Sequence, residues 1–233
     1  PGRNWEQIRT TIAYNDSNVK IAGHHAGISV GPDGATHQAI EDIATMRVIA
    51  NIKVFVPCDA IEAKKATVAA AKIWGPIYLR FGREKTPVIT TEETPYTPGK
   101  AEIFWQSKVP KVAIIACGPV LHNALLAAKE LEKEKIGTIV VNNHTVKPMD
   151  EKTILEVVRK CGAVVTVEEH QVSGGMGSAV AELLVKRCPL PVEFIGMQDI
   201  FGESGTPKEL IEKYGMGVKA IKAAVIRVLK RAK

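Results

Sequence analysis

Three of the six histidines fall within residues 23–42, a segment that also contains Asp33, four glycines and a proline. Imidazole groups exchange protons near neutral pH, and a carboxylate orients an imidazole or accepts a hydrogen bond from a ligand hydroxyl. Glycines allow the backbone to approach a ligand closely. We therefore interpret His25, Asp33 and His37 as a ligand site with acid–base capability, in preference to a polar loop with incidental histidines.

A metal site is the other interpretation of the same three side chains. They are separated by 8 and 4 residues, a spacing that fits no local metal motif. The cysteines are also far apart and follow no metal spacing, which favours buried free thiols in a reducing cytosol. These cysteines are Cys58, Cys117, Cys161 and Cys188. We expect no metal ligands among these residues.

The elements that position this loop alternate along the whole chain. Short β-branched runs predict strands at 18–22, 52–56, 77–81, 112–117, 138–142, 163–168 and 192–197. Helix-length segments lie at 4–13, 37–48, 59–73, 119–134, 150–161, 175–187, 207–214 and 217–231. This alternation predicts βαβ units with mainly parallel sheets, in which ligands bind at the carboxyl ends of the strands. The loop follows such a strand end.

Residues 84–100 break the alternation. The stretch is rich in proline and threonine, cannot sustain a helix, and predicts an extended linker. The predicted fold is therefore α/β, with two three-layer units over residues 1–83 and 101–233. We expect both sheets to be mainly parallel and the first unit to be incomplete at its N-terminus.

The second half carries its own cluster of ionisable residues. Glu168, Glu169 and His170 close a predicted strand in front of the Gly-rich turn at 173–177. This turn opens a predicted helix and resembles an anion-binding helix N-terminus. Because a Gly-rich turn alone is a weak signal, we favour tight packing or a dimer contact there. We expect His144 to be structural or to face solvent.

The net charge of +6 arises in the last helical segment, since residues 217–233 alone carry six cations and no acids. Its apolar residues recur at helical spacing, so we interpret the segment as an amphipathic helix with a solvated basic face and expect no nucleic-acid partner. No apolar run reaches the roughly 18–20 residues that span a bilayer. We also find no signal peptide, and expect a cytoplasmic protein with no membrane partner.

The loop is also similar in sequence to a known enzyme family. Residues 31–44, GPDGATHQAIEDIA, resemble the substrate loop of transketolases. Further stretches that resemble the family follow in order at 54–60, 78–84, 143–148, 167–177 and 201–207. The resemblance spans nearly the whole chain. It implies the carboxyl-terminal part of a transketolase, namely the second half of the pyrimidine-binding domain and the C-terminal domain.

The resemblance implies a role for each loop residue. His25 matches a histidine that contacts the donor sugar, and His37 a second substrate histidine near the sugar C1 hydroxyl and the phosphate end. Both would act as catalytic groups that pass protons as ketose bonds break and form. Asp33 matches the aspartate that binds a substrate hydroxyl, and Arg83 the arginine that binds the sugar phosphate. Arg80 stays open between phosphate binding and pairing with a surface acid.

The resemblance also implies a cofactor and a partner. The activity would be transfer of a two-carbon ketol unit between sugar phosphates in the pentose phosphate pathway, with thiamine diphosphate and Mg²⁺. The Gly-Asp-Gly…Asn metal motif of the family does not occur in this sequence, and the chain starts at Pro1, after the expected place of the catalytic glutamate. We therefore expect an amino-terminal diphosphate-binding domain or subunit to bind the cofactor, a homodimer, and a chain that is inactive alone.

Three alternatives remain beside the transketolase interpretation. A 1-deoxyxylulose 5-phosphate synthase carries a similar Asp-Gly-x-Thr-His loop, although the Gln-Ala-Ile-Glu-Asp continuation at 38–42 favours transketolase. The E1β subunit of a 2-oxoacid dehydrogenase is a weaker alternative. The third is a non-catalytic interaction module that has kept the fold. The set of His25, Asp33, His37 and Arg83 argues against it, because a scaffold needs none of them together.

Overall fold

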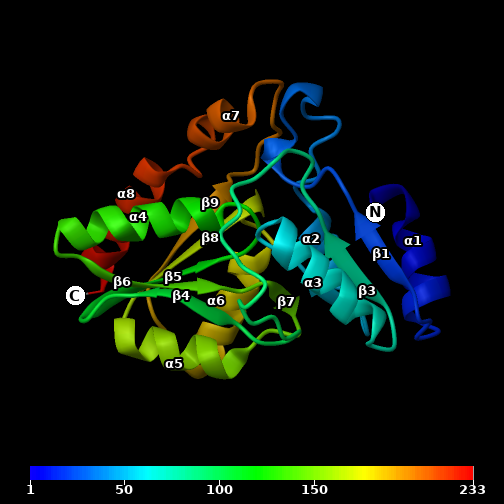
Figure 1. Cartoon of the computed structure of the whole chain (residues 1–233), viewed down its shortest axis with the longest axis horizontal. Coiled ribbons are helices and arrows are strands. Elements are labelled where there is room, and N and C mark those ends of the chain that lie inside the picture. The colour runs from blue at the N-terminus through cyan, green and yellow to red at the C-terminus, as the bar shows by residue number, and fades with distance from the viewer. Residues whose placement is uncertain (233) are drawn as a thin grey trace.

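The computed structural model describes residues 1–232, which form two lobes built on two separate sheets (Figure 1). Parallel strands dominate both sheets, and helices cover them. This arrangement confirms the predicted fold class of two α/β units with mainly parallel sheets.

The first sheet has the order β1-β3-β2-β7. Its strands are β1 (Lys20–Gly23), β2 (Lys53–Phe55), β3 (Ile77–Arg80) and β7 (Thr145–Lys147). The helical segments around it are η1 (Gly2–Asn4), α1 (Trp5–Gln7), η2 (Ile8–Ala13), α2 (Asp42–Arg47) and α3 (Ala60–Ala71). Alternate residues of β3 face opposite sides, with Ile77 and Leu79 packed against α3 and Tyr78 in the core on the other face. Both faces of the sheet are therefore covered.

The second sheet has the order β4-β6-β5-β8-β9, with only β4 antiparallel to its neighbour. Its strands are β4 (Glu102–Gln106), β5 (Pro110–Ala116), β6 (Gly137–Asn142), β8 (Val164–Gln171) and β9 (Val192–Met197). Its helices are α4 (Leu121–Lys133), α5 (Glu151–Cys161), α6 (Met176–Arg187), α7 (Pro207–Lys213) and α8 (Val218–Arg231). Helices α4 and α8 lie on one face and α5 and α6 on the other, while α7 lies near the first lobe (Figure 1).

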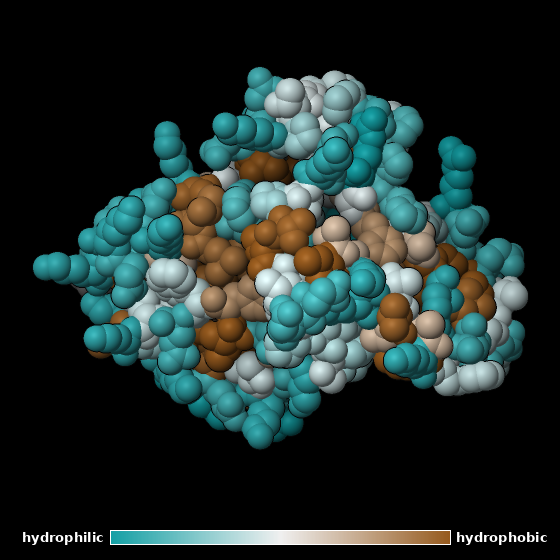
Figure 2. All heavy atoms as spheres, viewed as in Figure 1, coloured by the Kyte–Doolittle hydropathy of each residue, from teal (hydrophilic) through white to brown (hydrophobic). Residues whose placement is uncertain are grey.

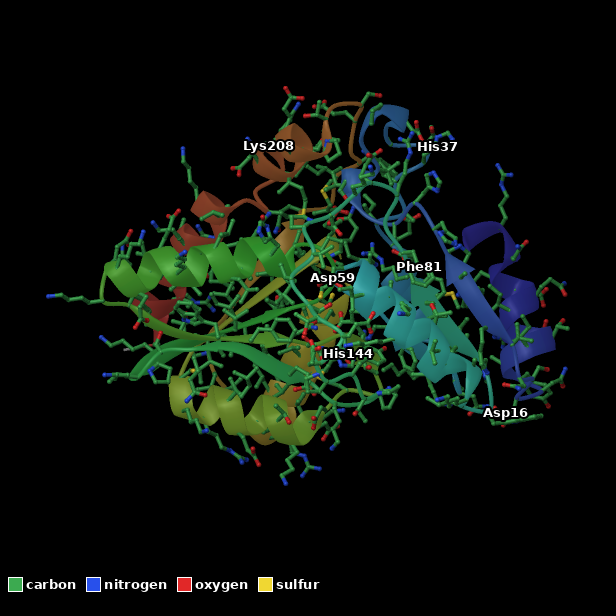
Figure 3. All side chains as sticks on the ribbon, in the orientation of Figure 1. Asp16, His37, Asp59, Phe81, His144 and Lys208 are labelled. Carbon is green, nitrogen blue, oxygen red and sulfur yellow. The ribbon has the colours of Figure 1, made fainter. Side chains whose placement is uncertain are left out.

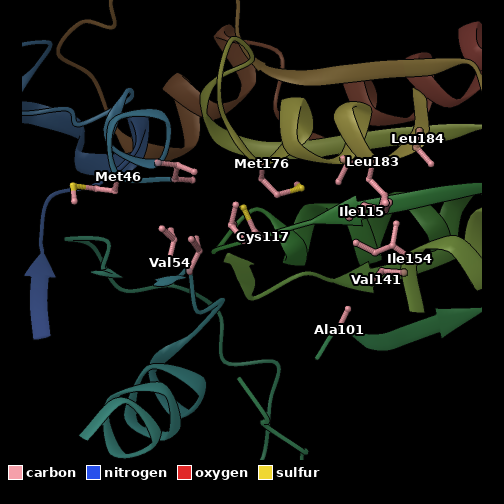
Figure 4. Close-up of a cluster of buried hydrophobic side chains, with 14 of the residues drawn as sticks. Met46, Val54, Ala101, Ile115, Cys117, Val141, Ile154, Met176, Leu183 and Leu184 are labelled. Atoms are coloured by element: carbon pink, nitrogen blue, oxygen red, sulfur yellow. The ribbon is translucent and has the colours of Figure 1, made fainter. Parts of the chain in front are cut away.

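One hydrophobic core runs from the first lobe into the second. Met46 and Val54 of the first lobe belong to the same buried cluster as Ile115, Ile154 and Met176 of the second (Figure 4). All five side chains are fully buried. Because close-packed interiors resist shear, the shared core fixes the two lobes relative to each other.

Strand β7 lies across the boundary between the lobes. It comes from the second half of the sequence but pairs antiparallel with β2 in the first sheet. The pairing continues at Val56, whose N–H donates to the His144 carbonyl at 2.7 Å. The sequence analysis did not predict β7 or β4. Both are antiparallel additions to sheets whose other pairings are parallel.

The helix predicted over 37–48 is wrong at its start, because α2 begins only at Asp42. His37 instead closes a turn by donating its N–H to the Gly34 carbonyl at 3.0 Å. Ala39 then forms a β-bridge with Ala26, which requires extended backbone. Contacts within the loop thus override the helical spacing of the apolar residues.

Residues 84–100 contain no helix or strand. The carboxylate of Asp59 binds them to the first lobe through hydrogen bonds. Its Oδ1 caps α3 by accepting from the Glu62 N–H at 2.9 Å, and also accepts from the Thr90 hydroxyl at 2.7 Å. Its Oδ2 accepts from the N–H groups of Ile89 and Thr90 at 2.8 and 2.7 Å. The segment contains turns but no helix or strand, and three of these hydrogen bonds hold it to Asp59.

Polar side chains dominate one face of the molecule (Figure 2). Figure 2 shows hydrophilic side chains over most of one face, with hydrophobic ones gathered across its middle, near the junction of the lobes. The basic face of α8 pairs with acids, since Lys222 contacts Glu130 and Glu134, and Arg231 contacts Glu193. None of the helices within residues 1–232 is long and apolar enough to cross a membrane.

Candidate active-site loop

The loop after β1 leaves the sheet and returns to the same point. Its two ends meet at the bridge between Ala26 and Ala39, where the Ala39 N–H donates to the His25 carbonyl at 3.2 Å. The Ala26 N–H donates to the Phe81 carbonyl at 3.1 Å, just beyond the carboxyl end of β3. The loop therefore projects from the carboxyl ends of the parallel strands, as the sequence predicts.

Between these ends lies η3 (Ile28–Asp33), a pair of short 3₁₀ turns with a kink at Gly31. The three glycines at 27, 31 and 34 have φ values of +85°, +80° and +74°. Residues other than glycine rarely adopt these backbone angles. The glycines of the loop therefore shape its path.

Asp33 and Arg83 form an ion pair at the rim of the loop. Arg83 Nη1 lies 3.2 Å from Asp33 Oδ1 and donates to the Val30 carbonyl at 3.0 Å. Glu84 lies 3.6 Å from the same nitrogen. Both side chains of the pair are about one-third exposed. Such partly solvated pairs are weak, so the guanidinium can exchange Asp33 for an anionic ligand.

His25 and His37 flank the bridge that closes the loop. His25 has a φ of +57°, a conformation rare outside glycine that marks local backbone strain. His37 lies on the outer rim of the loop, exposed, with Nδ1 3.0 Å from the Thr36 hydroxyl (Figure 3). His24 packs differently, with its ring centroid 5.2 Å from that of Phe81. The structure thus brings Asp33 and Arg83 into contact and places both predicted histidines on the same loop.

Two buried side chains, whose contacts the sequence analysis did not predict, attach this loop to the second lobe. Glu169 Oε2 accepts from the Ser29 N–H at 3.0 Å. Gln38 Nε2 donates to the carbonyls of Ile28 and Glu203 at 3.2 and 3.0 Å. The partners Ser29–Glu169 and Gln38–Glu203 are 140 and 165 residues apart, so no local pattern could have revealed them.

One large hollow of the described surface lies away from these residues. It has a volume of about 780 Å³ and lies beside Trp5, Tyr14 and Val48. A smaller groove of about 390 Å³ lies behind the loop and is lined by Ser29 and Glu169. Only the second of these connects to the candidate loop.

Comparison with known proteins decides the family. The family model described as "Transketolase, pyrimidine binding domain" matches residues 2–88, and the family model described as "Transketolase, C-terminal domain" matches residues 99–221. The chain belongs to the transketolase family. Its transketolase resemblance, inferred first from sequence motifs, is therefore confirmed.

Three similar proteins locate this transketolase-family chain within longer ones. The 6-deoxy-6-sulfo-D-fructose transketolase subunit SqwH of Clostridium sp. is 39% identical over 97% of this chain and 70% of its own length. A putative transketolase C-terminal section of Methanocaldococcus jannaschii is 39% identical over 99% of this chain and 72% of its own length. A solved structure described as a split gene transketolase, inactive beta4 tetramer, has a TM-score of 0.92 and 45% identity, covering 100% of this chain and 74% of that one. The chain thus corresponds to a transketolase C-terminal section.

Transketolases in general use thiamine diphosphate and a divalent metal, so the donors in this chain need a test. Across the part of the chain that the structure describes, no three His, Cys, Asp or Glu side chains are placed to hold a metal ion. The described carboxylates, thiols and imidazoles therefore do not fit the divalent metal of the cofactor.

Arg80, which the sequence left open between phosphate binding and pairing with a surface acid, pairs with a buried acid. It is buried in an ion pair with the buried carboxylate of Asp42, at 2.8 Å from Nε and 3.1 Å from Nη2. Nη2 also donates to the Glu169 carbonyl at 2.8 Å, and the Tyr78 hydroxyl donates to Asp42 at 2.8 Å. Burial alone would raise the pKa of Asp42, but the charge and hydrogen bonds of Arg80 outweigh it and lower the pKa. In this transketolase-family chain, Arg80 joins the lobes.

The Gly-rich turn at 173–177 packs tightly, as expected. A Cβ on Gly174 would lie only 2.8 Å from the Cβ of Ala44. The anion at the start of α6 is the carboxylate of Glu168, which accepts from the N–H groups of Met176 and Gly177 at 2.7 and 2.8 Å. Burial nevertheless raises the pKa of Glu168 to about 7. This helix terminus is therefore already occupied by the chain itself.

Proposed function

We propose that this chain is the C-terminal part of a transketolase that transfers a two-carbon ketol unit between sugar phosphates. The observation that carries the proposal is the Asp33–Arg83 pair on a glycine-shaped loop that also bears His25 and His37. The ordered family match from residue 2 to residue 221 supports it. The setting we propose is the cytoplasm and the pentose phosphate pathway.

Each side chain has a role that its chemistry suits. Arg83 turns from Asp33 to the anionic end of the sugar, which its planar guanidinium can bind through two hydrogen bonds. Asp33, released from Arg83, accepts a hydrogen bond from a sugar hydroxyl. His25 and His37 move protons at the sugar oxygens. Thiamine diphosphate, bound mainly by residues outside this chain, supplies the carbon–carbon cleavage.

We propose a diphosphate-binding partner domain or subunit, which provides the Mg²⁺ site, and a homodimer of the assembled pair. Two comparisons support a partner, since one similar protein is described as a subunit and another as a split gene transketolase. The latter is called an inactive beta4 tetramer. This chain alone should therefore be inactive.

The test is reconstitution. The chain, expressed with any residues that its gene adds before Pro1, should transfer a ketol unit from xylulose 5-phosphate to an aldose phosphate only after mixing with the diphosphate-binding partner. Turnover with pyruvate instead would assign a 1-deoxyxylulose 5-phosphate synthase. No turnover and no binding of sugar phosphate by calorimetry would favour the interaction module.

Arg83→Ala should raise the KM for the sugar phosphate of the assembled enzyme by about 10–100-fold, because a charge-assisted contact to the anion is lost. Steady-state kinetics should be measured with 6-phosphate and 6-sulfonate sugars, since one similar protein is named for a 6-sulfo sugar. The matched control is Arg159→Ala on the exposed face of α5, which should leave KM unchanged. Equal KM values for both variants would exclude Arg83 as the anion-binding residue.

A further inference from the structure

We infer that Glu169, on the second lobe, is a positioning residue that fixes the candidate active-site loop through the backbone of Ser29. The inference rests on the proposed function for its link to catalysis, while its structural part stands on the contacts themselves. It gives the C-terminal lobe a task in substrate binding although none of the four predicted site residues lies on it.

The direction of Glu169 follows from its place on β8. Successive side chains of a strand point to opposite faces, so Glu168 and Glu169 face opposite ways. Glu168 accepts hydrogen bonds from the first turn of α6. Glu169 faces the first lobe, where its Oε2 accepts from the Ser29 N–H at 3.0 Å. The residue is 3% exposed.

The loop backbone follows the surface of this side chain closely. A Cβ on Gly27 would lie 2.6 Å from Glu169 Oε2 and 2.9 Å from its Cβ, so only glycine fits beside the carboxylate. Ser29 lies in the first turn of η3, and Asp33 is its last residue. A shift of Ser29 therefore moves the short element that carries Asp33 and, through the ion pair, Arg83.

Other contacts of the second lobe act at the same place. The backbone carbonyl of Glu169 accepts a hydrogen bond from Arg80, so the main chain of Glu169 is also held in place. Gln38, which connects the far end of the loop to Glu203, prevents that end from moving independently. Along η3, Gly31 lies against the second lobe so closely that a Cβ would meet the Gly205 carbonyl at 3.2 Å. The loop is thus attached at both ends and supported along its length.

Burying the Glu169 carboxylate costs desolvation free energy, so its retention at this position favours a specific role in binding the loop. Burial raises the pKa of Glu169, and the hydrogen bond from Ser29 opposes the rise without cancelling it. Removing the acceptor would leave the Ser29 N–H without its partner, which weakens the loop more than it weakens the β8 strand. Glutamine keeps an acceptor oxygen at the same reach, whereas methionine keeps the size and removes the acceptor.

The experiment compares Glu169→Met, Glu169→Gln and the control Glu168→Gln. In the chain itself, Glu169→Met should speed hydrogen exchange of a peptide covering residues 26–36 by about tenfold, as expected for loss of one buried hydrogen bond. Glu169→Gln should restore exchange to within about twofold of the native chain. In the assembled enzyme, KM for the sugar phosphate should rise about fivefold or more for the methionine variant, with a smaller change in kcat and recovery in the glutamine variant. Glu168→Gln should change neither readout, because it contacts α6.

The results that would overturn the inference are specific. The inference is rejected if Glu169→Met leaves the hydrogen-exchange rate of residues 26–36 unchanged. It is also rejected if these residues exchange as fast in Glu169→Gln as in Glu169→Met. If Glu169→Met does not fold, Glu169→Asp, which withdraws the carboxylate by one methylene, should show the same exchange increase, and native exchange in it would also reject the inference. A different result is that the native chain, assembled with its diphosphate-binding partner, transfers no ketol unit while the variants show the expected exchange pattern. That result would reject the proposed function and leave the positioning role of Glu169 intact.

Discussion

Replacing Arg80 with methionine should lower the free energy of unfolding by about 3–5 kcal/mol, because the substitution leaves the Asp42 carboxylate buried without its countercharge. The two side chains of this pair are only 4% and 1% exposed, so water cannot replace the lost partner. Arg80 also donates to the carbonyls of Ala39 and Glu169, which join the loop to the second lobe. Chemical denaturation of the two chains at neutral pH gives the comparison.

The control uses the exposed ion pair of the same chain. Arg83→Met removes a guanidinium from Asp33, but both of those side chains are about one-third exposed. Its effect on the free energy of unfolding should therefore stay below about 1 kcal/mol. Equal losses in the two variants would show that burial does not make the Arg80–Asp42 ion pair of the first lobe more important than the exposed Arg83–Asp33 pair. Adding Asp42→Asn to Arg80→Met should recover part of the lost stability, since the unpaired charge is then removed.

Acidification should destabilise the protein through two buried histidines. Burial lowers the pKa values of His144 and His170 to about 4, below the ordinary value of 6.5. Since the folded pKa is depressed, the unfolded chain takes up protons first as the pH falls. Each histidine therefore contributes stability above pH 6.5 that is lost as the pH drops towards 4, at most about 3 kcal/mol per group.

His144→Phe isolates one of these contributions. The aromatic ring keeps its contact with Tyr96, whose ring centroid lies 4.2 Å away, but no longer titrates. Relative to the native chain, the variant should gain about 3 kcal/mol of unfolding free energy between pH 7 and pH 4, as measured by urea titrations. Glu168→Gln should show the opposite sign. The raised pKa of Glu168, about 7, means that its protonation stabilises the fold as the pH falls from about 7 to about 4.5. Parallel pH profiles for all three chains would contradict this account.

Much of the fold was predictable because its signals are local. Strands such as β6 are fully buried and mostly apolar, and helix starts such as Asp59 and Thr206 carry side-chain caps. The start of α2 was mispredicted because the backbone of residues 37–41 bonds to distant parts of the loop. Strand β7 has only three residues, too few for a pattern to identify.

The candidate site was predictable in part for the same reason. His25, Asp33 and His37 are close in sequence, and the structure shows Arg83 joined to Asp33. Their catalytic and binding roles stay predictions. Arg80 was ambiguous because its partner, Asp42, lies 38 residues away and no local pattern marks the pair. Glu169 and Gln38 hold the loop through hydrogen bonds to residues that lie 140 or more positions away in the sequence, and only the three-dimensional structure reveals such contacts.

Strand β7 has a consequence for how the protein is made. The first sheet takes its edge strand from residues 145–147, which pair with β2 at residues 54–55. During synthesis, the β2 edge therefore stays open until residues 145–147 have been translated and can pair with it. Open strand edges invite pairing with other chains. A nascent chain stalled before residue 145 should therefore depend on chaperones far more than one stalled late enough for residues 145–147 to have left the ribosomal exit tunnel, a difference that crosslinking on arrested ribosomes can measure.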